Sequence, residues 1–191
     1  MTDPSDRVRD VASLEREIER GWDPKYLLFW GHTPTKGRSV GPFVFSQWYP
    51  AAFSVDGLRY ATAEHFMMAE KASLFGDEDT RSRVIATSDP GAAKALGRKV
   101  RGFDDAAWTA ARFDIVVRGS VAKFGQNQTL RTYLLETGSK VLVEASAVDT
   151  VWGTGLARDH VNASTPSKWR GLNLLGFALM QARRELRERG I

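Results

Sequence analysis

Hydrophobic residues spaced three and four positions apart recur along most of the chain and predict a largely helical protein. Near the N-terminus, Val8, Val11, Leu14 and Ile18 would share one face of an amphipathic helix that ends at Gly21. A longer stripe of the same kind predicts a helix over residues 171–189. Similar patterns predict further helices at residues 63–74, 78–86, 91–99, 104–123 and 128–136.

Short apolar segments and one turn signal predict a small amount of β-structure. YLLFW (26–30) and KVLVEA (140–145) are predicted strands, and Asp56-Gly57 between AFSV and LRYA is typical of a β-hairpin. Strands and helices do not alternate as βαβ units do, so a doubly wound parallel sheet is not expected. The pattern predicts a mainly α fold of the α+β class, with about seven helices and a few short strands.

The composition is that of an ordinary globular protein. The chain has 191 residues, of which 42% are hydrophobic and 26% charged, and this favours one domain with a proper core. No apolar run approaches the ~20 residues of a membrane-spanning helix, and the polar N-terminal residues do not resemble a signal peptide. We therefore expect a cytoplasmic protein without a membrane partner. The sequence leaves its oligomeric state open.

Charge and cysteine content limit the chemistry further. A net charge of +4 gives a weak preference for anionic partners. Because acidic and basic residues are mixed along the chain, a solvated surface is favoured over a nucleic-acid-binding one, although nucleic acid stays an alternative partner. The chain has no cysteine, which excludes disulfides, thiolate nucleophiles and cysteine-ligated zinc.

Several well-known catalytic signatures do not occur in the chain. It contains no GxxxxGK[ST] phosphate loop, no strand-GxGxxG-helix unit and no GxSxG nucleophile motif. His32, His65 and His160 do not stand at metal-ligand spacings, so each is expected to be a core or surface histidine. We therefore expect neither a metal nor a cofactor.

A single acid, Glu64, stands among apolar residues at the start of the predicted helix 63–74. Thr62 would be the N-cap, which places Glu64 in the first turn, where the helix dipole favours a negative charge. The carboxylate is therefore either a helix-start residue with no further role or one part of an active site.

A second acid, Asp149, precedes Trp152 in an irregular loop after the predicted strand 140–145. It is either a turn-forming aspartate or a second site carboxylate. Trp48, Trp152 and Trp169 lie in or beside loops, where core packing explains them less well, and aromatic walls with carboxylates suit a base or a sugar ring. Cleavage of a ribosyl–nitrogen bond fits this set, since a carboxylate stabilises the oxocarbenium-like transition state and activates water.

Four segments together resemble successive motifs of the NADAR (YbiA-like) family. In the family's order they are FSQWYPAAF, YATAEHFMMAEKA, VLVEASAVDTVWGTGL and WRGLNLLGFALMQAR. The resemblance covers about residues 26–186 and implies a mostly helical fold with small strands. It implies one domain over residues 26–191, preceded by an added N-terminal helical extension over residues 1–25.

The resemblance also implies an N-glycosidase. Family members resemble enzymes that hydrolyse the ribosyl–amine bond of phosphorylated riboflavin-biosynthesis intermediates, and others act on ADP-ribose linked to a nucleobase. The expected partner is a small-molecule phosphoribosyl or ADP-ribosyl substrate. Three alternatives stay open: an N-glycosidase of a phosphorylated ribosyl compound, a hydrolase of ADP-ribosyl adducts on nucleotides or nucleic acid, and a module that binds NAD or ADP-ribose without turnover.

The resemblance assigns site residues motif by motif. The family's glutamate in [ST]xEH matches Glu64, its tryptophan in the long middle helix matches Trp108, its WG tryptophan matches Trp152, and the acid three residues earlier matches Asp149. Glu64 and Asp149 are therefore the expected catalytic residues. The expected substrate contacts are Phe45, Gln47, Trp48, Lys71, Trp108, Trp152, Thr154 and Asn173, with Lys36 or Arg38 as a further phosphate ligand.

The chain departs from the riboflavin-pathway type at two places. That type carries WGDG where this chain has WGTG, with Thr154 at the position of the acid, and FSNF where residues 45–48 read FSQW. The missing carboxylate puts that particular substrate in question. Two alternatives follow: Asp149 compensates for the missing acid, or the substrate has a better leaving group.

Overall fold

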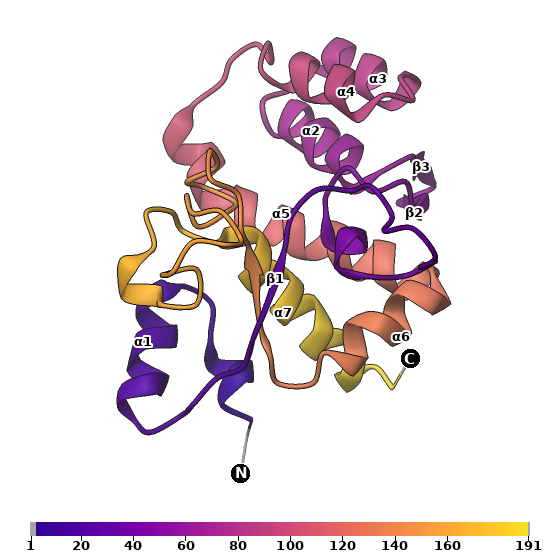
Figure 1. Ribbon diagram of the computed structural model, residues 1–191. Helices are drawn as coiled ribbons and strands as arrows, with labels where there is room; N and C mark the ends of the chain where they lie inside the picture. The colour runs from indigo at the N-terminus through magenta and orange to yellow at the C-terminus, as the bar shows by residue number, and fades with distance from the viewer. Residues whose placement is uncertain (1–2, 191) are drawn as a thin grey trace. The chain divides into compact units, whose positions relative to one another are not determined.

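The described residues, 3–190, form seven α-helices, four short strands and three 3₁₀ turns in a computed structural model (Figure 1). The chain divides into two units, one of Met1–Ser46 with Thr129–Ile191 and the other of Gln47–Gln128. Helical residues outnumber strand residues in both units, so the mainly α fold of the α+β class that the sequence predicts is confirmed.

Two parallel strands and one long helix form the core of the first unit. β1 (Tyr26–Phe29) pairs with β4 (Val141–Glu144) so that Phe29 lies opposite Glu144, and α7 (Leu174–Glu188) packs along β4 (Figure 1). Because the strands are parallel, their carboxyl ends lie at the same edge of the pair. The loops that follow Phe29 and Glu144 therefore start side by side.

The N-terminal helix belongs to this first unit. α1 (Val11–Glu19) begins with a capping box, in which Asp10 and Ser13 each accept from the other's backbone N–H. The helix packs against the 3₁₀ turn η3 (Pro166–Lys168). The boundary between extension and domain at residue 26 stays a prediction.

The last helix begins later than the sequence predicts. α7 starts at Leu174 and not at Gly171, because the backbone N–H groups of residues 170–175 donate to carbonyl oxygens within residues 150–154. We call residues 146–155 the Trp152 loop. A Cβ on Gly171 would lie 2.3 Å from the carbonyl oxygen of Gly153, so this close approach requires glycine.

A second glycine and an asparagine fix the start of α7 to β4. A Cβ on Gly176 would lie 2.0 Å from the carbonyl oxygen of Leu142. Asn173 has a left-handed backbone (φ 50°); its Oδ1 accepts from the N–H of Glu144 (2.9 Å) and its Nδ2 donates to Leu142 (3.0 Å). The GLNLLG segment is therefore a helix-to-strand junction.

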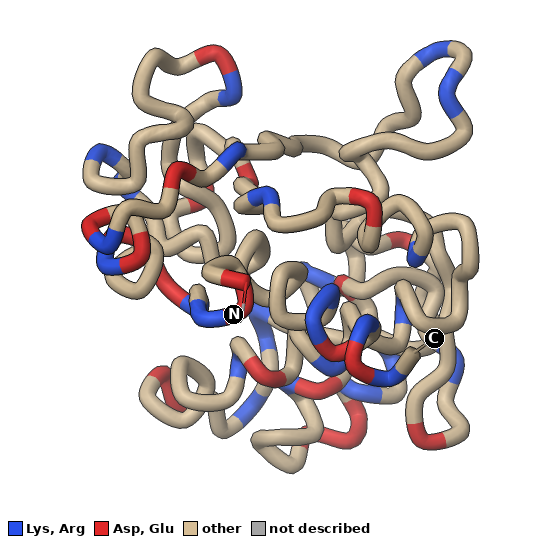
Figure 2. The backbone as a smooth tube through the Cα atoms, turned by 90° about the horizontal axis from the view of Figure 1, so that it is seen from below, with Lys and Arg blue, Asp and Glu red and all other residues tan. Residues whose placement is uncertain are grey.

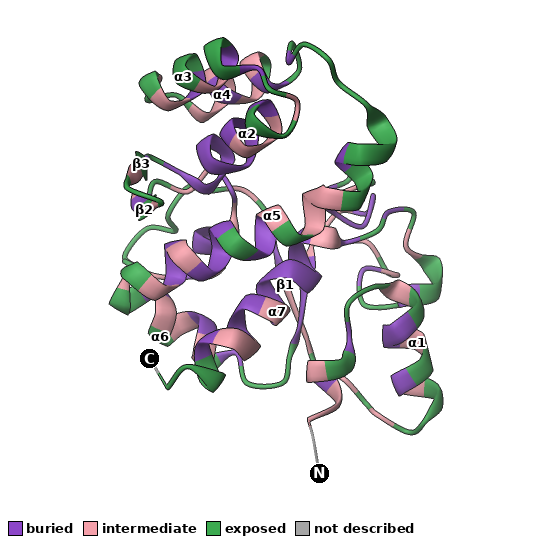
Figure 3. Cartoon of the chain, turned by 180° about the vertical axis from the view of Figure 1, so that it is seen from behind, coloured by how far each residue is buried: buried purple, intermediate pink, exposed green. Residues whose placement is uncertain are grey.

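In the second unit, a buried helix is surrounded by three others. Figure 3 shows α2 (Ala63–Leu74) largely buried, whereas α3 (Glu78–Ala86) is exposed over much of its outer face. α3, α4 (Pro90–Gly97) and α5 (Asp105–Gln126) all pack against α2. The predicted helices are thus present, with α5 ending three residues beyond the predicted 123.

Small residues allow the neighbours of α2 to approach it closely. A Cβ on Gly97 of α4 would lie 2.0 Å from the sulfur of Met68, and a Cβ on Gly119 of α5 would lie 2.6 Å from the ring of Phe66.

The predicted hairpin is also present, with β2 (Phe53–Val55) and β3 (Leu58–Tyr60) joined by Asp56-Gly57.

The remaining helix, α6 (Gln128–Glu136), follows α5 directly and leads into β4. Over residues 3–190, none of the helices has the length and apolar character that crossing a membrane requires. Acidic and basic residues are interspersed along the backbone (Figure 2).

Candidate active site

Glu64 is a buried carboxylate in the first turn of α2. Thr62 is the N-cap, with an extended backbone and a side chain that accepts from the N–H of His65 (3.4 Å). Glu64 is only 3% exposed, and it sits where the helix dipole favours a negative charge. The local prediction of an N-cap followed by an acid is confirmed. The burial adds what the sequence could not supply, a carboxylate largely removed from water.

The FSQW segment reaches the same helix end through one backbone contact. The N–H of Glu64 donates to the carbonyl oxygen of Gln47 at 3.0 Å, and the Gln47 side chain is itself buried. The next residue, Trp48, presents its ring to the Lys94 ammonium, 5.9 Å from the ring centroid. Gln47 and Trp48 are therefore held beside the start of α2.

His65 serves the helix start and does not resemble a metal ligand. Its Nδ1 lies 2.8 Å from the Thr62 hydroxyl, and burial is the main cause that lowers its pKa. An imidazole held in this way is neutral near pH 7. Within residues 3–190, no three histidine, aspartate or glutamate side chains stand close enough together to hold a metal ion.

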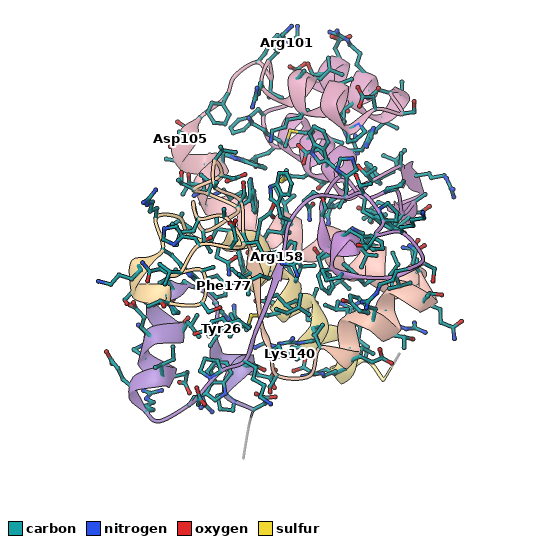
Figure 4. The ribbon with its side chains drawn as sticks, in the orientation of Figure 1. Tyr26, Arg101, Asp105, Lys140, Arg158 and Phe177 are labelled. Atoms are coloured by element: carbon teal, nitrogen blue, oxygen red, sulfur yellow. The ribbon has the colours of Figure 1, made fainter. Side chains whose placement is uncertain are left out.

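Lys71 lies two turns further along α2 in an aromatic setting. Its ammonium is 4.2 Å from the ring centroid of Phe103 and 5.5 Å from that of Trp108, which is largely buried on α5. Burial lowers the pKa of Lys71. The negative charge of Asp105, the first residue of α5 (Figure 4), partly offsets this by raising the same pKa. The structure thus brings together Lys71 and Trp108, two of the expected substrate contacts.

Sequence reasoning missed Lys123, a fully buried lysine on α5. Its ammonium lies 5.7 Å from the ring of Tyr49 and 5.2 Å from that of Phe124, and burial lowers its pKa to about 7. A lysine with such a pKa can gain or lose a proton near neutral pH. Nothing in the sequence distinguishes it from a lysine on a solvated helix face.

In the first unit, Asp149 builds the turn that carries Trp152. Its Oδ1 accepts from the N–H groups of Val151 (2.9 Å) and Trp152 (2.8 Å), and its own N–H donates to the Ser146 hydroxyl. The geometry is that of a turn-forming aspartate, one of the two roles that the sequence allows for this residue. It also fixes the position of Trp152, so the two roles are compatible.

Thr154 and Phe45 lie inside the first unit. The hydroxyl of Thr154 faces the carbonyl oxygens of Glu144 (3.5 Å) and Leu156 (3.4 Å), and no part of the residue is exposed. Phe45 is equally buried; its ring lies 5.4 Å from those of Phe29 and Tyr133. Packing within the first unit therefore explains why both residues are buried. The hydrogen bonds to β4 explain the position of Asn173 in the same way.

The expected site residues therefore fall into two groups, each with its own internal contacts. The second unit holds Gln47, Trp48, Glu64, Lys71 and Trp108. The first unit holds Phe45, Asp149, Trp152, Thr154 and Asn173. Lys36 and Arg38 lie in the exposed loop after β1.

The fold and the buried acid define a largely helical protein with a buried carboxylate at a helix N-terminus. A family model described as the NADAR domain matches residues 28–187, so the chain belongs to the NADAR family. The resemblance of the four motifs is thereby confirmed.

Individual relatives share much of the sequence. N-glycosidase R617 of Acanthamoeba polyphaga mimivirus is 42% identical over 84% of this chain and 96% of its own length. Protein irg-1 of Caenorhabditis elegans is 33% identical over 75% of each chain. N-glycosidase YbiA of Escherichia coli is 31% identical over 74% of this chain and 80% of its own. The solution structure of E. coli YbiA superimposes with a TM-score of 0.70 at 25% identity, covering 100% of this chain and 95% of the other.

Proposed function

We propose that the protein is an N-glycosidase that hydrolyses the bond between a ribose and a nitrogen atom in a phosphorylated, nucleotide-like metabolite. Relatives named N-glycosidase, at 42% and 31% identity, support the general reaction, which is hydrolysis of an N-glycosidic bond. The observation that carries the chemistry is the burial of Glu64 at the N-terminus of α2.

Glu64 supplies what the reaction needs at the sugar. As the C1–N bond breaks, its electron pair leaves with the nitrogen and positive charge develops on C1 and the ring oxygen. An ionised carboxylate in a site of low dielectric stabilises that charge, and it accepts a proton from the water that attacks C1. The departing nitrogen takes up a proton, so the net reaction is the addition of water across the bond.

The aromatic and basic residues near α2 fit the rest of such a substrate. Trp48 and Trp108 offer flat surfaces for a base or sugar, and Gln47 offers an amide for hydrogen bonds. Lys71, between the rings of Phe103 and Trp108, is the proposed phosphate ligand.

For the first unit, the proposal gives Asp149 an orienting role. Its carboxylate holds the backbone of Trp152, and Trp152 is the residue proposed to touch the substrate. Thr154 stands where the riboflavin-pathway type has an acid. The proposal therefore does not assume that intermediates of that pathway are the substrate, and it includes them among the compounds to be tested. Phe45 and Asn173 support the framework on which these residues stand.

A substrate panel tests the proposal directly. Purified protein is incubated with phosphoribosylamine intermediates of riboflavin synthesis, with nucleoside 5′-monophosphates and with ADP-ribosylated nucleobases, and release of ribose 5-phosphate or ADP-ribose is measured. Turnover of any one of them supports an N-glycosidase and identifies its substrate class. Tight binding of ADP-ribose without product after long incubation would replace the enzyme with a binding module.

Salt dependence separates the two kinds of substrate. If the substrate is an adduct on nucleic acid, affinity falls steeply as the salt concentration rises, because phosphate contacts release counterions. A flat response is expected for a small metabolite.

A further inference from the structure

A small pocket in the first unit is lined by residues to which the sequence analysis gave no role. It has a volume of about 340 Å³ and is bordered by Trp30, Ala145, Ala147, Val148, Ala157, Arg158 and Asp159. That volume lies near the lower end of the range for small-molecule sites, roughly 300–1,000 Å³. It suits one planar ring system with its substituents better than a whole dinucleotide.

The pocket lies at the carboxyl ends of the two parallel strands. Trp30 directly follows β1, and Ala145 directly follows β4; the N–H of Ala145 donates to the carbonyl oxygen of Phe29 at 2.9 Å. Ligands of parallel sheets bind outside the carboxyl ends of strands, where loops of different origin meet. The position is therefore favourable for a binding site, although this sheet has only two strands.

The exposed aromatic ring is the most unusual feature of the pocket. Trp30 is 66% exposed, and Val148 on the Trp152 loop is 91% exposed. Exposure of such apolar surface to water costs free energy, and a ligand that covers the surface removes this cost. Trp30 and the small aliphatic side chains of the pocket together offer an apolar surface on which a flat heteroaromatic ring can stack.

Two charged residues give the pocket polarity. Arg158, labelled in Figure 4, and Asp159 come from the segment after the Trp152 loop, and both are exposed. Among residues 3–190, neither takes part in an ion pair or hydrogen bond, so both charged groups can serve a ligand. A guanidinium binds phosphate oxygens, and a carboxylate accepts from amino groups on a base.

We propose that this pocket binds the nucleobase of a phosphorylated nucleotide, with the base stacked on Trp30, its amino group bound by Asp159 and a phosphate bound by Arg158. The ligand class is an amino-bearing heteroaromatic base joined to a phosphorylated sugar. The proposal concerns binding within the first unit alone and does not depend on the proposed function. The base can come from a free nucleotide or from a single-stranded nucleic acid, since both present the same chemistry.

Binding of adenosine 5′-monophosphate tests the proposal without any need for turnover. Equilibrium dialysis of labelled nucleotide compares the natural protein with Trp30→Ala, Trp30→Phe and Arg158→Gln. Loss of the indole should weaken binding roughly ten- to hundredfold, in line with the worth of one base–aromatic stack, whereas Trp30→Phe should retain most of the affinity. Arg158→Gln should weaken binding of the nucleotide as well.

Matched controls come from the same unit. Val161→Ala removes another exposed apolar side chain and Lys168→Gln another exposed cation, and neither residue lines the pocket. Both variants should bind the nucleotide like the natural protein. Ribose 5-phosphate, which has no base, should bind Trp30→Ala and the natural protein equally.

The outcomes separate this proposal from the proposed function. Equal nucleotide affinity in Trp30→Ala and the natural protein, or no binding of the nucleotide at millimolar concentration, overturns the pocket assignment. If a substrate is hydrolysed but the nucleotide binds Trp30→Ala as tightly as the natural protein, the pocket fails and the enzyme stands. If no substrate is hydrolysed but Trp30-dependent binding persists, the pocket assignment stands and the proposed function fails.

A second arm identifies the source of the base. A short single-stranded oligonucleotide replaces the free nucleotide, with the same variants. Trp30-dependent binding that weakens steeply with salt supports a nucleic-acid ligand, and binding of the free nucleotide alone supports a metabolite.

Discussion

The backbone N–H of Glu64 donates to the carbonyl oxygen of Gln47, so two motifs that are separated in the sequence meet at one helix end. The contact satisfies one of the N–H groups that a helix leaves unpaired in its first turn. It also sets the Gln47–Trp48 segment beside the start of α2. This hydrogen bond therefore joins the proposed catalytic acid to a segment that holds two of the proposed substrate contacts.

Replacing Glu64 by Gln should remove activity and leave the fold intact. The amide keeps the size of the side chain and loses its charge, so stabilisation of the cation and activation of water are both lost, and kcat should fall roughly 10²–10⁴-fold. Activity of the purified variant on the substrate found by the panel measures this.

A matched control is Glu78→Gln, which alters another acid in the first turn of a helix, at a position that is exposed. It should leave kcat unchanged. Full turnover by Glu64→Gln, with an unchanged circular dichroism spectrum, would remove Glu64 from the mechanism.

Replacing Asp149 separates an orienting role from a chemical one. Asn retains an oxygen that accepts from the N–H groups of Val151 and Trp152, so Asp149→Asn should keep most of the activity. Asp149→Ala leaves both groups without their acceptor and should destabilise the protein by about 1–3 kcal/mol. Urea denaturation and steady-state kinetics are measured together. An inactive but stable Asp149→Asn would instead assign a direct role to the carboxylate.

The glycine at the junction of α7 and β4 should not tolerate a side chain. In Gly176→Ala the new Cβ would lie 2.0 Å from the Leu142 carbonyl oxygen, so the helix must shift away from the strand. We expect a loss of about 1–3 kcal/mol in the free energy of unfolding. Gly91→Ala is the control, because its Cβ would meet only ordinary contacts of 3.4 Å and more. Equal stability of the two variants would contradict this account of the junction.

The ion pair between Asp77 and Arg101 should make stability depend on acid pH. Hydrogen bonds from the side chain and backbone N–H of Arg101 hold the pKa of Asp77 well below its ordinary value of 3.8, and the buried carboxylate also caps α3 (Figure 4 labels Arg101). The stabilisation is complete above about pH 4, the unfolded-state value, and is lost as pH falls toward the lower folded-state pKa.

Thermal unfolding between pH 2 and pH 7 measures this effect. Asp77→Asn should melt below the natural protein at neutral pH, and the difference should shrink in acid. The exposed Asp79→Asn should show little difference at any pH. A difference in melting temperature between Asp77→Asn and the natural protein that stays constant down to pH 2 would mean that the Asp77–Arg101 pair is not the source of the pH dependence.

Local signals made much of this structure predictable. Thr62 before an acid, and Asp56-Gly57 between two β-prone segments, specify a helix start and a hairpin through contacts among near neighbours. The same holds for the boundaries of α2 and α3, which match the predicted ranges.

Features set by distant contacts were not predictable in this way. The start of α7 depends on bonds to the Trp152 loop, and the left-handed Asn173 depends on β4, so the local pattern alone placed the helix start too early. The burial of Lys123 and the pocket at Trp30 arise from tertiary packing. A periodic pattern shows which side of a helix is apolar, but not what finally covers a given side chain.

The Trp152 loop is held mainly by backbone groups, with the N–H groups of residues 170–175 bonded to its carbonyl oxygens. Its shape therefore depends little on which side chains stand at positions 150–152, as long as glycine remains at 153 and 171. Substitutions there can change what the loop touches without unfolding it. In the proposed function Trp152 contacts the substrate, so this frame would allow new substrate preferences to be selected at low cost to stability, by evolution or in a mutant library.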